Sequence, residues 1–297
     1  MTRNQGNAQF DASTCTRLHQ LIAHQALAQP AGVALWWQGT VIDYASLQRN
    51  ILAAAGRLAA HGTVGDRIAL LSWNCPEFVE LLYGVPAAGK ILVPLNIRLA
   101  PAELIYQLQC AGATTMFGER DLLKPLLAHA DFPPGVRIIA LGDDYEAWLA
   151  NAHSAELPTT CGEDPAWILF TSGSTGRPKG AVLSHRSLLA GLRSAALARP
   201  VNADDKYYYP FPLFHVAAHN VLLQHQYGAA VVLARSFDAA DTLRACRELQ
   251  VTAMSLAPTM IAMLLDHPDF TPTDLRSVRT IGYGASAMPQ TLLQRLL

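Results

Sequence analysis

The stretch that decides the fold runs from Ile168 to His185 and reads ILFTSGSTGRPKGAVLSH. Apolar residues flank small hydroxyl side chains, glycines and one lysine, so we predict a loop between two buried strands. Gly173, Gly176 and Gly180 let backbone N–H groups converge on an anion, and Lys179 adds a full positive charge. The hydroxyl donors are Thr171, Ser172, Ser174 and Thr175. The stretch therefore predicts a polyphosphate-binding loop.

Two other interpretations of this loop are weaker. The Walker loop requires a lysine directly after its second conserved glycine, whereas Arg177 and Pro178 separate Gly176 from Lys179 here. A polar hairpin without a ligand uses the same small residues. The order of the residues and the single lysine favour phosphate binding.

The unbroken run from Thr171 to Gly180 resembles the phosphate-binding signature of the adenylate-forming superfamily. That superfamily includes acyl-CoA synthetases, aryl-CoA ligases, luciferases and the adenylation domains of peptide synthetases. The resemblance implies an acid–thiol ligase that converts a carboxylic acid, with ATP and Mg²⁺, to an acyl-adenylate. The acyl group then passes to a thiol, usually that of coenzyme A. A non-catalytic remnant that binds an acyl group, a carrier protein or a partner subunit is the alternative.

The resemblance also implies site residues. The loop residues that hold pyrophosphate are Thr171, Ser172, Gly173, Ser174, Thr175, Gly176 and Lys179. His215, in the segment PFPLFHVAAH, falls where the family places a residue beside the reacting carboxylate, and we predict a catalytic role for His215 and Lys179. Gly284 and Ala285 fall where the family forms the floor of the acyl pocket and contacts adenine. No metal ligand is predicted in this chain.

Each of these assignments has a structural or chemical competitor. His215 can cap a strand end, and with His219 it has the spacing of zinc ligands, although Val216 stands where a metalloprotease needs its glutamate. The segment from Gly282 onward satisfies a dinucleotide pattern, nearly satisfies a nucleophile elbow, and can also be a tight turn. We expect no response to NAD(P).

The predicted pocket walls indicate the class of acid. In the family they come partly from residues 215–227 and 278–286, which are here mostly small and apolar and contain no acidic residue. A charged amino acid requires a carboxylate to pair its ammonium group. A fatty or aryl acid is therefore the predicted substrate.

Composition sets the remaining limits. Of 297 residues, 51% are apolar and 15% charged, and the net charge of -1 gives no reason to expect nucleic acid as a partner. The five cysteines contain no Cys-x-x-Cys pair, which favours reduced thiols. Residues 1–13 lack the apolar core of a signal peptide, and the longest apolar stretch, Val251–Leu265, is too interrupted to span a bilayer. We predict a cytoplasmic protein without a membrane segment.

Alternating strands and helices predict an α/β fold with two stacked, doubly wound, mostly parallel sheets and flanking helices. We place one α/β subdomain at residues 1–165 and a second, beginning with the loop, at residues 166–297. Asp143–Asp164 is predicted to be an exposed connector. Ser184 is predicted to cap a helix that follows the loop.

The family pattern extends beyond the last residue of this sequence. After Leu297 it has a magnesium-binding glutamate, a ribose-binding aspartate and a small lid domain with a lysine. We therefore expect this chain to be the N-terminal portion, to be weakly competent at most by itself, and to self-associate through an apolar surface.

Overall fold

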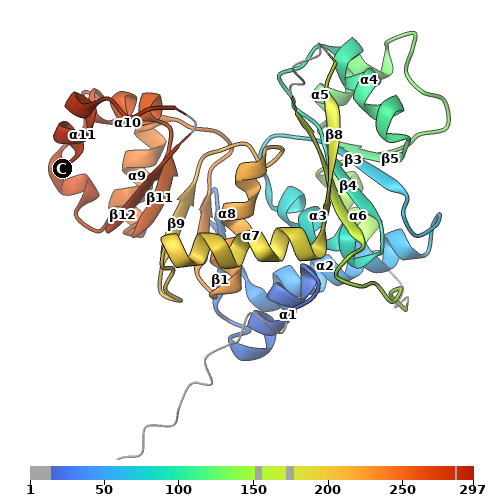
Figure 1. Ribbon diagram of the computed structural model, residues 1–297, viewed down its shortest axis with the longest axis horizontal. Coiled ribbons are helices and arrows are strands. Elements are labelled where there is room, and N and C mark those ends of the chain that lie inside the picture. Colours follow the sequence, from blue (N-terminus) through green and yellow to red (C-terminus); the bar gives the residue numbers. More distant parts are fainter. Residues whose placement is uncertain (1–14, 151–155, 172–176, 285) are drawn as a thin grey trace, which may run out of the picture.

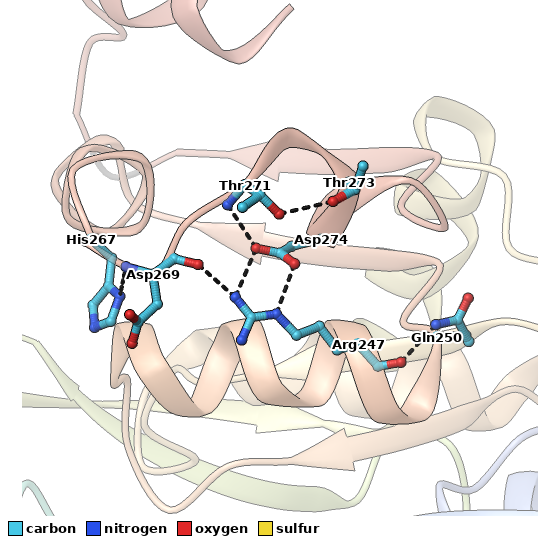
Figure 2. Close-up of polar contacts among 7 residues, drawn as sticks. All are labelled: Arg247, Gln250, His267, Asp269, Thr271, Thr273 and Asp274. Carbon is cyan, nitrogen blue, oxygen red and sulfur yellow. Dashed lines mark hydrogen bonds and ion pairs between the residues drawn. The ribbon is translucent and has the colours of Figure 1, made fainter.

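The computed structural model describes residues 15–150, 156–171, 177–284 and 286–297 as two six-stranded sheets with flanking helices (Figure 1). The first sheet has the strand order β6-β5-β3-β4-β7-β8. Its strands are β3 (Arg67–Leu71), β4 (Ile91–Pro94), β5 (Ala113–Gly118), β6 (Arg137–Ala140), β7 (Pro165–Thr171) and β8 (Lys179–Ser184). Neighbouring strands are parallel except for the antiparallel pair β7–β8 at one edge.

The second sheet has the order β12-β11-β9-β10-β1-β2 and follows the same plan. Its strands are β1 (Val33–Trp37), β2 (Thr40–Asp43), β9 (Lys206–Tyr209), β10 (Ala230–Leu233), β11 (Ala253–Leu256) and β12 (Thr280–Tyr283). All neighbours are parallel except the antiparallel edge pair β1–β2. The predicted α/β class with mostly parallel sheets is confirmed.

Helices form three layers around the two sheets (Figure 1). Between the sheets lie α1 (His19–Ala28), α2 (Tyr44–Ala59), α3 (Pro76–Ala87), α6 (Asp143–Ala150), α7 (His185–Ala198) and α8 (His219–Gln226). The outer face of the first sheet is covered by α4 (Pro101–Ala111) and α5 (Arg120–Leu127). The outer face of the second is covered by α9 (Ala239–Leu249), α10 (Pro258–Leu265) and α11 (Gln290–Leu296). The short 3₁₀ helices are η2 (Val216–Ala218) and η3 (Pro272–Leu275).

The central strands of each sheet are buried on both faces because their residues alternate between two clusters. In β3, for example, Ile68 and Leu70 face the helices between the sheets, whereas Ala69 and Leu71 face α4 and α5. Such strands read as continuous apolar runs. Among the described residues, no helix combines the length and hydrophobicity that crossing a membrane requires.

Two local predictions were wrong. The segment predicted as an exposed connector begins with helix α6, because Tyr145 and Trp148 are buried against Phe117, with ring centroids 5.9 and 5.2 Å from it. The strand after the loop, β8, is not buried: it is an edge strand with its first four residues exposed. An edge strand gains only one neighbour, so its outer side faces solvent.

Each sheet also contains one hairpin that comes from the other half of the chain. The hairpin β1–β2 joins the sheet built mainly from the second half of the chain, and β7–β8 joins the sheet built from the first half. The two layers are thus interlocked through chain connectivity. The predicted cap is confirmed: Ser184 Oγ accepts a hydrogen bond from the Ser187 backbone N–H at 3.2 Å, at the start of α7.

Candidate active site

Asn74 joins the carboxyl ends of the two sheets. It follows β3, its side chain is buried, and its Nδ2 donates to the carbonyls of Phe211 and Ala234, each at 2.8 Å. Its Oδ1 accepts from the backbone N–H of Leu213, also at 2.8 Å. Phe211 and Ala234 follow β9 and β10 of the other sheet. One amide therefore fixes the segment that leads to His215 against the first sheet.

A second polar cluster lies at the same junction. Glu119, which follows β5, accepts hydrogen bonds from Ser72 Oγ and the Trp73 N–H at 2.9 Å and pairs with Arg235 at 2.6 Å. The Arg235 guanidinium also lies 5.8 Å from the centroid of the Trp73 ring. A hollow of about 390 Å³ opens here, lined in part by Trp73, Arg235 and Phe214. Crevices at the carboxyl ends of parallel strands are the usual ligand sites of doubly wound proteins.

The described ends of the glycine-rich loop face each other across the β7–β8 hairpin. Thr171 pairs with Lys179, and directly opposite residues of an antiparallel pair project from the same face. Thr171 Oγ1 lies 3.5 Å from the Lys179 carbonyl, a weak contact, and both side chains are exposed. Within the described residues Lys179 makes no ion pair. A hydroxyl and an ammonium group thus stand together and accessible.

Not every predicted site residue belongs to the described part of the chain. Those outside the described part of the chain are Ser172, Gly173, Ser174, Thr175, Gly176 and Ala285.

The return arm of the loop is held by α4. The Arg177 guanidinium lies 5.7 Å from the centroid of the Tyr106 ring, and the Tyr106 hydroxyl donates to the Pro178 carbonyl at 3.4 Å. A Cβ at Gly180 would stand only 2.7 Å from Ile168 Cγ2 on β7. The close approach of the two strands therefore requires glycine at this position, and it fixes where Lys179 begins.

His215 lies on the second sheet's side of the junction, with its ring exposed. Its Nδ1 accepts a hydrogen bond from the Ala217 N–H at 3.3 Å, so His215 caps η2. In the neutral tautomer that fits this bond, Nε2 carries the proton and is a donor. No hydrogen bond among the described residues joins Lys179 to His215 or Gly284.

The zinc alternative does not fit the geometry at His219. Burial lowers the pKa of His219, and its Nε2 lies 3.0 Å from the Leu188 carbonyl, to which it donates. That nitrogen is occupied. Among the described residues, no group of three or more His, Cys, Asp or Glu side chains is arranged to hold a metal ion.

The glycine segment near the C-terminus does not form a dinucleotide turn. Gly282 lies within β12, paired with Ser255 of β11, and the next helix begins only at Gln290. Both the dinucleotide pattern and the nucleophile elbow need a helix directly after the turn. Gly284 is exposed, and a Cβ there would meet no atom of the described structure within 4 Å. The space beside Gly284 is open.

A polar cavity between α7, α8 and the second sheet was not predicted from the sequence. Tyr207 donates to Ser255 Oγ at 2.7 Å, and burial raises the pKa of Tyr207 to about 12. Arg199, which follows α7, donates to Asn220 Oδ1 at 3.0 Å and approaches Ser255 Oγ at 3.5 Å. A serine within the otherwise apolar strand β11 was the only local signal.

A family model described as "AMP-binding enzyme" matches residues 22–297. Feruloyl-CoA synthase from Amycolatopsis sp is 32% identical over 276 residues, covering 92% of this chain and 55% of that protein. Long-chain-fatty-acid–CoA ligase FadD13 from Mycobacterium tuberculosis is 31% identical, with 92% and 56% covered. The chain spans about half the length of the curated relatives it matches.

Two solved structures show the same fold. The inhibitor-bound N-terminal domain of FACL13 from Mycobacterium tuberculosis has a TM-score of 0.88 at 29% identity, covering 94% of this chain and 72% of that one. The o-succinylbenzoate CoA synthetase MenE from Bacillus subtilis, in complex with ATP and magnesium, has a TM-score of 0.80 at 26% identity, covering 93% and 56%.

Proposed function

Because this chain belongs to the AMP-binding enzyme family, we propose that it forms part of an enzyme that activates a carboxylic acid with ATP and transfers the acyl group to coenzyme A. The observation that carries the proposal is the β7–β8 hairpin, which presents Thr171 and Lys179 together at the carboxyl end of the first sheet, the same end at which Asn74 joins the two sheets. The relatives, named as CoA ligases of feruloyl and long-chain fatty acyl groups, support it.

In the first step a carboxylate oxygen attacks the α-phosphorus of ATP. The bond between the α-phosphorus and the oxygen that bridges to the β-phosphorus then breaks. The pyrophosphate that leaves carries several negative charges. Lys179 and the Thr171 hydroxyl project from one face and stabilise that charge as it develops. Magnesium bound to the nucleotide would neutralise further phosphate charge.

His215 is the residue proposed to contact the reacting end of the acid. Its exposed ring, held through Nδ1, leaves Nε2–H to donate to an oxygen of the substrate carboxylate or of the α-phosphate. In the second step the thiol sulfur attacks the acyl carbon, the bond to AMP breaks, and the thiol proton is released. Gly284, with open space beside it, lies where the adenylate is proposed to rest.

Fatty or aryl acids are the proposed substrates, because the two stretches on either side of the site carry no carboxylate to pair an ammonium group. We also propose a cytoplasmic location. All five cysteines are free, and three of them are buried, as expected for a protein of a reducing compartment.

Acid-dependent exchange of labelled pyrophosphate into ATP tests the proposal directly. The native protein is assayed with straight-chain and aryl carboxylic acids, and coenzyme A is added in a second assay to follow thioester formation. We expect exchange with at least one of these acids, and thioester only when coenzyme A is present. Binding of an acyl group or a carrier protein without ATP-dependent exchange would contradict the enzyme and support the non-catalytic remnant.

A further inference from the structure

The polar cavity beside Arg199 is lined by elements that also lead to residues of the proposed site. Its wall includes Leu223 and Gln224 of α8, the helix that follows His215, and Gly282 of β12, the strand that leads to Gly284. These elements belong to the two stretches predicted to line the acyl pocket. The cavity therefore borders the helix that follows His215 and the strand that leads to Gly284, the two residues proposed to face the reacting end of the acid.

The charge in this cavity is not neutralised by the protein. Among the residues that the structure describes, the side chain of Arg199 donates only to neutral acceptors, the Asn220 amide oxygen at 3.0 Å and, more weakly, Ser255 Oγ at 3.5 Å. Within the described residues it forms no ion pair, whereas Arg279 on the same cavity is paired with Asp205. A guanidinium has five N–H donors. Arg199 therefore keeps both its charge and unused donors.

The cavity has room for one small polar group. Its volume is about 50 Å³, enough for roughly three or four water molecules, and a carboxylate is of similar size. Gly282 keeps it open: a Cβ there would stand 2.9 Å from Ser255 Oγ and 3.6 Å from Arg199 Nη1. The side chains of Val201 and Leu223 provide apolar wall beside the charged end.

We propose that Arg199 makes this site selective for carboxylic acids that carry a second carboxylate at the end remote from the reacting one. The inference rests on the proposed function and names the substrate class of the same site. Paired charge and hydrogen bonds from a guanidinium to a carboxylate supply the preference, and the apolar wall accepts the chain between the two ends. A plain fatty or aryl acid leaves the guanidinium without its counter-charge.

The test compares acids that differ only at the remote end. Straight-chain dicarboxylates of increasing length are each compared with the monocarboxylate of the same length, and terephthalate is compared with 4-methylbenzoate. The readout is the KM of each acid in pyrophosphate exchange by the native protein. We expect at least one diacid with a KM about tenfold or more below that of its partner, as hydrogen bonds to a charged group imply.

Variants assign the preference to Arg199. Arg199→Met should raise the KM of the preferred diacid about tenfold and leave that of the monoacid within about twofold, because only the diacid uses the guanidinium. Arg199→Lys, which keeps the charge but not the fork of donors, should lose only part of the preference. Arg244→Met is the matched control, since Arg244 is exposed on α9 and paired with Asp241.

The possible results distinguish a failure of the proposed diacid preference from a failure of the proposed function. Exchange with monoacids but no preferred diacid, or equal losses for both acids in Arg199→Met, overturns the inference and leaves the proposed function standing. Absence of exchange with every acid overturns both.

Discussion

The two edge hairpins, β1–β2 and β7–β8, occupy the same place in their sheets and differ most in their turns. Each is an antiparallel pair beside parallel strands, and each runs directly into a capped helix, with Asp43 capping α2 and Ser184 capping α7. Gln38 and Gly39, at φ of 46° and 82°, close the first hairpin in two residues. Residues 172–178 close the second. Because two residues suffice to close such an edge, the additional length in the second serves something other than the sheet.

The largest expected difference between the hairpins is in catalysis. Lys179→Ala should slow pyrophosphate exchange by about 10²- to 10³-fold, the usual cost of removing a group that stabilises developing charge. The KM of the acid should change much less, because the ammonium acts on the pyrophosphate. Gln38→Ala, in the other turn, should leave exchange unchanged. Equal rates for Lys179→Ala and the native protein would remove the distinction between the two turns.

Replacing a glycine by alanine should destabilise each hairpin, but for different reasons. Gly39→Ala places a side chain at φ of 82° and should cost about 1 to 2 kcal/mol in urea denaturation with exchange unaffected. Gly180→Ala forces a Cβ against Ile168 and should cost about 1 to 3 kcal/mol, and exchange should fall about tenfold because Lys179 moves.

A double variant checks that explanation. Adding Ile168→Ala to Gly180→Ala removes the contacting methyl group and should restore part of the exchange rate. No recovery would mean that the space between β7 and β8 does not position the loop.

The smallest expected difference between the two hairpins lies in how the stability contributed by their helix caps, Ser184 and Asp43, depends on pH. Ser184→Ala should cost about 1 kcal/mol, with little dependence on pH, because a hydroxyl does not titrate in the acid range. Hydrogen bonds from Ser46 lower the pKa of Asp43, so its carboxylate stabilises the fold above its unfolded pKa, and this contribution is lost as pH falls through the folded pKa.

The measurement is urea denaturation at neutral and acid pH. Asp43→Asn, which keeps a capping oxygen, should be less stable than the native protein at neutral pH, and the difference should shrink on acidification. A difference that grows on acidification would contradict the sign of the pKa shift.

The sequence predicted what local chemistry determines. The α/β class, the two strands around the glycine-rich loop and the Ser184 cap follow from patterns a few residues long. Helix α6 was missed because its two aromatic residues are buried by Phe117, which lies far away in the sequence. Asn74 was missed because the two residues to which its amide donates are 137 and 160 residues away in the sequence. The exposure of β8 was missed because the residues of one strand do not show its place in the strand order of the sheet.

The clamp made by Asn74 has a mechanical consequence. Separating the two sheets at that point breaks three hydrogen bonds at once and strands two carbonyls and one N–H, at a cost of several kcal/mol. We therefore expect no hinge at this point, and the two sheets should behave as one stiff block. Any movement during the proposed reaction would then occur in the segments attached to this block and not at the junction itself.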